Sequence, residues 1–353
     1  MIVSIKNDAS TEAVEGVKIF LTEHQIPYRY NQIYQKRAFV ITEKVDSGIL
    51  DIFNAMNGVE AVLPGGKEYP LASKQFKETP TTICLKNSVI GGKGINIVAG
   101  PCSIESEEQI FSIAQFLKKI RVKYIRGGAY KPRTSPYRFQ GLGLDGLKMI
   151  RQAADENDLL VVTEVLDSSL LDQTYPYADI LQVGSRNMQN FHFLKQLGKT
   201  NKPILLKRGM NVPVEEWLMA AEYILAEGNE KLILCERGIK SFDNLMRNTM
   251  DIAAIPLVKS LSHLPIWADP SHGTGRRDLV GPVSLAAIAA GADGLVIEIH
   301  PDPDHALSDG QQSLYLDQFY DLLQQMQPVA RAVNRYIDSE TTRQTEKINL
   351  CVE

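Results

Sequence analysis

The chain has only four cysteines among its 353 residues, and no two of them are spaced as Cys-x-x-Cys. This scarcity and spacing argue against a disulfide framework and for a reducing compartment. The amino terminus lacks the long apolar segment of a secretory signal, and no apolar run approaches membrane-spanning length. We therefore expect a cytoplasmic protein without a membrane partner.

An excess of charge of either sign is also missing, since 38 basic residues stand against 42 acidic ones and the formal net charge is -4. This balance gives no overall field that would attract nucleic acid or an anionic membrane. A charged ligand must therefore be recognised by a local cluster of side chains. The length suits one α/β domain of about 250 residues with a smaller companion.

The N-terminal residues 1–65 alternate between strand and helix patterns. The expected elements are a strand at 2–5, a helix at 12–23, a hairpin at 28–42, a helix at 47–56 and a strand at 60–63. Their order, βαββαβ, predicts a ferredoxin-like domain. Pro64, Gly65 and Gly66 then interrupt the periodicity, which indicates a linker over residues 66–80.

Residues 81–338 repeat a pattern of strand followed by helix. Eight apolar runs begin the repeats, at 95–99, 123–127, 159–164, 179–183, 203–207, 231–235, 265–269 and 293–298. This count predicts an α/β fold of the (β/α)8 TIM-barrel type. A hairpin at 82–90 precedes the first run and is expected to plug the floor of the barrel. Residues 339–353 are interpreted as a C-terminal tail.

Almost every predicted strand ends in a functional group, and in such a barrel the carboxyl ends of the strands meet at one mouth. Five of these groups are cations: Arg126, Lys131, Arg186, Lys207 and Arg237. Such a cluster, in a chain of slightly negative charge, predicts a small and highly charged anion. Phosphoenolpyruvate, which joins a carboxylate to a phosphate, carries about three negative charges and suits forked guanidinium groups.

A thiol, an imidazole and a carboxylate also lie at strand ends, on Cys102, His272 and Glu298. With a fourth ligand they would hold a borderline divalent ion such as Mn2+, Fe2+, Zn2+ or Co2+, whereas Mg2+ would not explain the thiolate. The loop after the last strand offers four candidates: Asp302, Asp304, His305 and Asp309. The other cysteines are interpreted as small buried apolar side chains: Cys84, Cys235 and Cys351.

A stiff polar loop, Lys131-Pro132-Arg133-Thr134-Ser135-Pro136, follows the second strand of the barrel. The prolines hold the chain extended, and the cations and hydroxyls suit a second phosphate. Arg276 is expected to reach the same phosphate from across the mouth. The alternative is a solvated loop without a ligand.

Five short segments carry a resemblance to a known family. They are Gly100-Pro101-Cys102-Ser103, the Lys131-Pro132-Arg133-Thr134-Ser135 loop, Gly184-Ser185-Arg186-Asn187, Leu206-Lys207-Arg208 and Asp269-Pro270-Ser271-His272. Together they resemble the 3-deoxy-D-arabino-heptulosonate 7-phosphate (DAHP) synthases, over roughly residues 80–338. The loop is the most specific segment, because the sister family that makes 3-deoxy-D-manno-octulosonate 8-phosphate typically carries Lys-Ala-Asn-Arg-Ser there.

The resemblance implies a metal-dependent transferase that condenses phosphoenolpyruvate with D-erythrose 4-phosphate and water, with one divalent ion per subunit. It implies four metal ligands: Cys102, His272, Glu298 and Asp309. It places the phosphoenolpyruvate carboxylate at Arg126 and Lys131, and the phosphate at Arg186, Lys207 and Arg237. Erythrose 4-phosphate would bind Arg133, Thr134 and Ser135, with Arg276 added by the argument above. The catalytic candidates are Lys131, Glu164 and His272; whether Glu164 or Lys131 orients the attacking water stays open.

The N-terminal unit resembles the ferredoxin-like regulatory domain of one branch of that family, where aromatic amino acids bind and inhibit. It implies feedback inhibition by tyrosine or phenylalanine through residues 1–65, and sheet edges that pair between subunits of a homotetramer. Three alternatives remain. They are the octulosonate synthase, which uses arabinose 5-phosphate; a catalytically silent effector-binding barrel; and a metal-dependent sugar-phosphate aldolase, which would leave several cations without partners.

Overall fold

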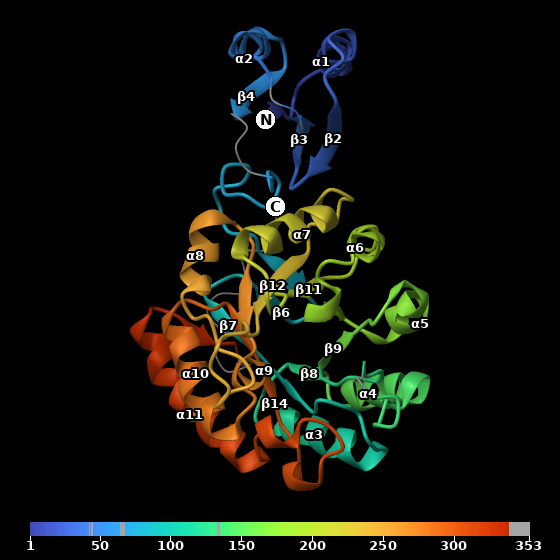
Figure 1. Cartoon of the computed structure of the whole chain (residues 1–353), viewed down its shortest axis with the longest axis vertical. Coiled ribbons are helices and arrows are strands. Elements are labelled where there is room, and N and C mark those ends of the chain that lie inside the picture. The colour runs from blue at the N-terminus through green and yellow to red at the C-terminus, as the bar shows by residue number, and fades with distance from the viewer. Residues whose placement is uncertain (42, 44, 64–67, 133–134, 339–353) are drawn as a thin grey trace.

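The computed structural model describes residues 1–41, 43, 45–63, 68–132 and 135–338 (Figure 1). A small sheet with two helices stands at one end of the long axis, and a larger barrel of strands ringed by helices fills the rest. Within the described residues, no helix is both long and apolar enough to cross a membrane.

The N-terminal unit has the predicted βαββαβ order. Its elements are β1 (Ile2–Ile5), α1 (Thr11–Glu23), β2 (Tyr28–Ile33), β3 (Lys36–Ile41), α2 (Ser47–Ala55) and β4 (Val59–Leu63). The strands pair antiparallel in the order β2-β3-β1-β4. Helix α1 begins where the Ser10 hydroxyl accepts a hydrogen bond from the Ala13 backbone N–H. One face of that helix is apolar and packs on the sheet, which gives the unit its own core.

Eight parallel strands form the barrel that the sequence predicts. They are β7 (Gly94–Gly100), β8 (Tyr124–Arg126), β9 (Leu160–Glu164), β10 (Ile180–Val183), β11 (Ile204–Lys207), β12 (Leu232–Glu236), β13 (Ile266–Ala268) and β14 (Gly294–Glu298). Each pairs with its neighbour along the chain, and β14 pairs with β7, which closes the ring. Because both faces of such strands are covered, they appear in the sequence as continuous apolar runs.

Helices surround the barrel on the outside (Figure 1). They are α3 (Glu107–Lys119), α4 (Gly143–Glu156), α5 (Leu171–Thr174), α6 (Phe191–Gly198), α7 (Val214–Leu225), α8 (Ala254–Leu261), α10 (Arg277–Ala289) and α11 (Leu316–Ala332). The short helix α9 (Pro270–Thr274) directly follows the carboxyl end of β13 and so lies at the mouth. The mouth is therefore bounded by strand ends and the loops that follow them.

The floor of the barrel is closed by the expected hairpin, β5 (Ile83–Leu85) with β6 (Ser88–Ile90). Ile83 and Ile90 pack against Tyr124 and Trp267 in the barrel interior, so the hairpin fills the end opposite the mouth. The last described strand, β15 (Tyr336–Ile337), pairs with the start of β7 at the same end.

The N-terminal unit contacts the barrel at this floor end. The Tyr34 hydroxyl donates to the backbone oxygen of Glu230 at 2.9 Å, and the Tyr34 ring stands edge-on to His263 with centroids 5.0 Å apart. Residues 64–67 of the predicted linker region lie outside the described residues. The part from residue 68 onward is irregular but packed, since Leu71 and Phe76 are buried in the main core.

The cysteines depart in one respect from the prediction. Cys102 and Cys235 are buried and free, but Cys84 is exposed, so its interpretation as a small buried apolar side chain was wrong. The physical reason for the exposure is alternation along β5, where Ile83 takes the inward position and Cys84 the outward one. Cys351 and the rest of the predicted tail, residues 339–353, lie outside the described residues.

Candidate active site at the barrel mouth

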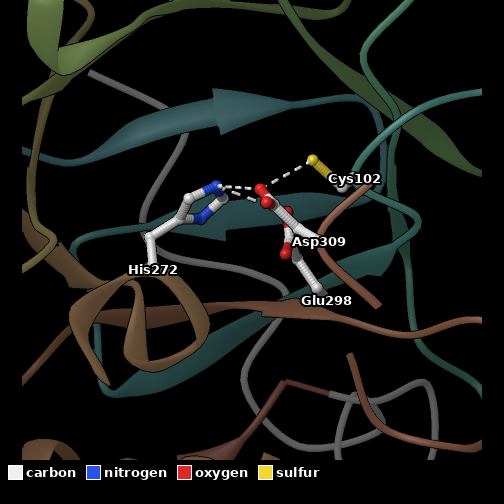
Figure 2. A group of neighbouring side chains, drawn as sticks. All are labelled: Cys102, His272, Glu298 and Asp309. Carbon is white, nitrogen blue, oxygen red and sulfur yellow. Dashed lines mark hydrogen bonds and ion pairs between the residues drawn. The ribbon is translucent and has the colours of Figure 1, made fainter. Parts of the chain in front are cut away.

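Four side chains from different elements converge at the mouth (Figure 2). Cys102 follows β7, His272 lies in α9, Glu298 ends β14, and Asp309 lies in the loop after β14. One ligand atom from each lies within 4.8 Å of the others. The Sγ atom of Cys102 is 3.2 Å from Oδ2 of Asp309, and Nε2 of His272 is 3.4 Å from Oε1 of Glu298. These are the four residues that the resemblance implies as metal ligands.

The structure also distinguishes the four candidates in the last loop. Asp304 is occupied by the Arg277 guanidinium at 2.9 Å and the Tyr315 hydroxyl at 2.7 Å, and Asp302 contacts His305. Only Asp309 among the four joins the cluster in the part of the chain that the structure describes.

Two cations offset the negative charge of this cluster. Arg126 donates from Nη1 to Oε1 of Glu298 at 2.5 Å, and Lys131 donates from Nζ to the Cys102 sulfur at 3.0 Å. Burial would raise the pKa of Asp309, but the His272 and Arg247 charges outweigh it and lower that pKa to about 2. Burial outweighs the neighbouring Lys131 and Arg126 charges and raises the pKa of the Cys102 thiol to about 12, so without a metal ion the thiol is neutral and donates to Asp309.

This donor set fits a divalent metal ion. A thiol, an imidazole and two carboxylates suit a borderline transition metal. The Asp269 carboxylate lies 2.8 Å from Nδ1 of His272, which fixes the proton there and leaves Nε2, the atom facing Glu298 and Asp309, free to coordinate. The ligands come from separate strand ends and loops, so the fold itself brings them together.

A cavity of about 740 Å3 lies beside the cluster. Its walls include all five predicted cations: Arg126, Lys131, Arg186, Lys207 and Arg237. Among the described residues, neither Arg186 nor Arg237 forms an ion pair with a carboxylate. Arg237 is buried, and a buried guanidinium without a carboxylate partner favours an anionic ligand because it otherwise bears a desolvation cost, whereas Arg186 is exposed at the edge of the cavity and free to meet the same ligand.

Glu164 lines the same cavity at the end of β9 and accepts a hydrogen bond from Nε2 of Gln182 at 3.2 Å. Gly184 lies directly against it, since a Cβ atom at position 184 would be 2.1 Å from Oε1 of Glu164. Glycine at position 184, in the Gly184-Ser185-Arg186-Asn187 segment, therefore leaves room for the Glu164 carboxylate.

The residues predicted for the second phosphate are only partly brought together. Ser135 lines the cavity, whereas Arg133 and Thr134 lie outside the described residues. Arg276 does not line it; it borders an adjacent hollow of about 780 Å3 and pairs with Asp278 at 2.8 Å. Arg138, which the sequence analysis did not select, lines the cavity beside Ser135.

Two supporting residues were missed by the sequence analysis. Asp269 contacts both His272 and Lys207, and Gln312 donates to Oε2 of Glu298 at 2.6 Å while accepting from Nη1 of Arg247 at 3.0 Å. A signal for Asp269 was present, because it begins the segment that contains His272. No local pattern indicates Gln312, whose role depends on the path of its loop.

Comparison with known proteins agrees with this geometry. Residues 74–335 match the profile of the family described as "DAHP synthetase I family". The chain is 46% identical over 333 residues to the phospho-2-dehydro-3-deoxyheptonate aldolase of Thermotoga maritima, which covers 94% of this chain and 98% of the relative. A crystal structure of the Thermotoga maritima DAHP synthase matches with a TM-score of 0.77 at 44% identity, covering 96% of this chain and 99% of that one.

A relative from the sister family is less similar. The 2-dehydro-3-deoxyphosphooctonate aldolase of Desulfotalea psychrophila is 31% identical over 278 residues, which covers 72% of this chain and 98% of the relative. Both the identity and the share of this chain that is matched are lower than for the Thermotoga protein.

Proposed function

This chain belongs to the DAHP synthetase I family, and on that premise we propose which of its residues carry out the reaction. Its activity is the condensation of phosphoenolpyruvate with D-erythrose 4-phosphate and water to give DAHP and phosphate, the first step of the shikimate pathway. The octulosonate synthase alternative is not favoured, because relatives with that name are more distant.

Cys102, His272, Glu298 and Asp309 are proposed to hold one divalent ion, with Mn2+, Fe2+, Zn2+ and Co2+ as the candidates. Such an ion, when bound, supplies Lewis acidity toward the aldehyde oxygen of erythrose 4-phosphate. Support comes from the spacing of the four ligand atoms and from the hydrogen bond that leaves Nε2 of His272 free.

The five cations are proposed to bind phosphoenolpyruvate. Arg126 and Lys131, which lie nearest the cluster, face the carboxylate. Arg186, Lys207 and Arg237 face the phosphate, and the two arginines among them have no carboxylate partner within the described residues. Two arginine forks can engage a phosphate bidentately, which fixes the orientation of the enol.

With phosphoenolpyruvate held this way, its methylene carbon attacks the aldehyde carbon and a carbon–carbon bond forms. The alkoxide that results takes a proton, for which the Lys131 ammonium beside Cys102 is a suitable donor. Water adds to the electron-deficient carbon that bears the phosphate, and the hemiketal then loses inorganic phosphate. Glu164 lines the cavity and is proposed to orient this water and accept its proton; Lys131 is the other candidate, as the neutral amine left after its ammonium has given a proton to the alkoxide.

Ser135, with Arg133 and Thr134, is proposed to bind the phosphate of erythrose 4-phosphate. Arg276 would have to leave Asp278 in order to contribute. Replacing Arg276 with Ala therefore separates the two cases: the KM for erythrose 4-phosphate rises if Arg276 binds the phosphate, and stays unchanged if it remains paired with Asp278.

We divide the chain into a regulatory domain over residues 1–65, a linker over 66–80, a catalytic barrel over 81–338 and a tail over 339–353. The N-terminal sheet is proposed to bind tyrosine or phenylalanine as a feedback inhibitor. Its two edge strands, β2 and β4, have no further strand partner among the described residues, which supports pairing between subunits in a homotetramer. Light scattering tests the assembly, and cell fractionation tests the cytoplasmic location.

The observation that carries the proposal is the placement of the four-ligand cluster beside a cavity that five cations line. The test measures phosphate release from phosphoenolpyruvate with erythrose 4-phosphate, arabinose 5-phosphate or no aldehyde, with and without chelator and added Mn2+. Chelator-sensitive release that requires erythrose 4-phosphate is expected. Release that is unaffected by chelator would refute the metal assignment.

Regulation is tested on the full chain by adding tyrosine or phenylalanine and following both activity and amide hydrogen exchange. Inhibition with increased protection inside residues 1–65 is expected. Inhibition without protection in those residues would move the effector site elsewhere.

A further inference from the structure

Asp269 touches residues of both proposed binding sites. It follows β13, caps helix α9 and is fully buried. Its Oδ1 accepts the backbone N–H of His272 at 2.9 Å, and its Oδ2 lies 2.8 Å from Nδ1 of the same residue. The Lys207 ammonium donates to that same Oδ2. One carboxylate oxygen is therefore shared between a proposed metal ligand and a proposed phosphate ligand.

The shared contact connects distant parts of the barrel. Lys207 ends β11 and Asp269 follows β13, so the ion pair crosses the end of the intervening strand β12. Both partners are almost completely buried, since the Lys207 side chain is 5% exposed and that of Asp269 is 0% exposed. Little water can therefore replace either donor when the other one changes.

Two donors that share one acceptor atom compete for it. A cation on Nε2 of His272 polarises the imidazole and makes its Nδ1–H a stronger donor to Oδ2. The same oxygen then attracts the Lys207 ammonium less, and that ammonium is freer to meet an incoming phosphate. In the other direction, a phosphate that draws Lys207 away leaves Asp269 a stronger acceptor for Nδ1–H, which makes Nε2 a better metal ligand.

We propose that Asp269 is a positioning residue that couples the two sites, so that a divalent metal and phosphoenolpyruvate each strengthen the binding of the other. The inference rests on the roles proposed above for His272 and Lys207. Coupling of this kind is reciprocal, because the factor by which one ligand changes the affinity of the second must equal the factor in the reverse direction.

The test is calorimetric titration of the metal-free, full-length protein, without turnover. Mn2+ is titrated with and without phosphoenolpyruvate, and phosphoenolpyruvate with and without Mn2+, with the direct association of the two in buffer subtracted. For the unaltered chain we expect each ligand to tighten the other by the same factor, on the order of 5- to 100-fold.

In Asp269→Asn the side chain keeps its size but loses its negative charge, and its single amide oxygen cannot serve both the His272 backbone N–H and the donor pair of Nδ1–H and the Lys207 ammonium. We expect the coupling factor to fall to within about twofold of one, with weaker binding of Mn2+. A variant that binds both ligands and retains the coupling factor of the unaltered chain would overturn the proposal.

Glu236→Gln is the matched control. Glu236 is another fully buried carboxylate at a strand end, but it pairs with Nη1 of Arg208 at 2.7 Å and has no hydrogen bond to His272 or Lys207 in the described structure. Its replacement is expected to leave the coupling factor unchanged. Loss of coupling in this control as well as in Asp269→Asn would attribute the effect to general loosening and overturn the proposal.

Lys207→Gln breaks the same link from the opposite side and serves if Asp269→Asn does not fold. Loss of coupling supports the proposal, and undiminished coupling overturns it. The variant also tests the proposed function separately: unchanged affinity for phosphoenolpyruvate without Mn2+ would remove Lys207 from the phosphate site, whatever the coupling factor.

Discussion

The floor and the mouth of the barrel both bury charged side chains, but they treat these charges differently. At the floor, Lys123 pairs with Asp338, while Asp293 meets Lys259 at 2.7 Å and Arg335 at 3.1 Å. At the mouth, Arg186 and Arg237 line the cavity and form no ion pair with a carboxylate in the described structure. The floor thus pairs its charges within the fold, whereas the mouth, beside the buried pairs Arg126–Glu298 and Lys207–Asp269, also keeps two arginines available for ligands; for the buried Arg237 this has a cost in stability.

The largest effect is expected for Cys102→Ala at the mouth. Removing a thiolate ligand should lower phosphate release by about 10⁴-fold, because the Lewis acidity that the metal provides is worth several kcal/mol. Activity assays at saturating Mn2+ measure this. Cys235→Ala is the matched control, since Cys235 is also a free buried cysteine but lies in the apolar barrel interior. Full activity of Cys102→Ala would contradict the ligand role.

At the floor, Lys123→Met is expected to lower stability and to leave substrate binding unchanged. This change leaves Asp338 without its ammonium partner, and breaking a buried pair costs about 3–5 kcal/mol of unfolding free energy. Urea unfolding measures the loss, and the KM for phosphoenolpyruvate should stay unchanged. An increase in that KM without loss of stability would show that the two ends of the barrel are not separate in function.

His263 at the floor should make stability depend on pH. Burial lowers the pKa of His263 to about 4, from an ordinary value of 6.5, and both ring nitrogens are engaged, at 2.8 Å from Thr81 and from Leu71. The neutral ring therefore stabilises the fold above pH 6.5, and this contribution, about 3 kcal/mol, is lost as the pH falls from 6.5 through 4.

Urea unfolding of the wild-type chain and of His263→Gln between pH 4 and pH 8 checks this. The glutamine does not titrate, so the stability difference between the two proteins should shrink as the pH falls. A difference that stays constant over the whole range would show that His263 does not titrate as its burial indicates.

The smallest effect is expected for Arg237→Met, which tests whether a cation at the mouth serves the ligand and not the fold. Loss of one charge-assisted hydrogen bond should raise the KM for phosphoenolpyruvate by roughly 10- to 100-fold. Because Arg237 has no carboxylate partner in the described structure and burial lowers its pKa, the melting temperature should stay the same or rise. A marked fall in melting temperature would assign Arg237 to the fold instead.

The sequence allowed the barrel to be predicted because strands covered on both faces appear as apolar runs, and parallel strands bring their ends together at one mouth. Cys102, Glu298 and His272 could be found in this way. The choice of Asp309 depended on the resemblance, because the path of its loop is set by contacts distant in sequence. Arg277 of α10 pins that loop by donating to Ser313 O at 2.7 Å and Gly310 O at 3.0 Å, while Asp309 itself has φ +54°.

Other features could not be read from local pattern. Asp269 and Gln312 act by touching other functional residues, and such contacts leave no periodicity. Arg276 follows the His272 segment closely in sequence, but pairing with Asp278 turns it out of the cavity. A neighbouring position in sequence at a strand end therefore does not ensure that a side chain faces the mouth.

The pairing of β15 with the start of β7 also affects how such chains can evolve. Asp338 reaches back to Ser88 at 2.5 Å, so the first and last described parts of the barrel region meet at the floor. A ring whose two ends already touch can be cut at another loop and rejoined there, because circular permutation requires neighbouring ends. It can also gain or lose an appended segment at that junction without a strand being displaced. Sequence shuffling at the floor can therefore create new fusions while the chemistry at the opposite end stays intact.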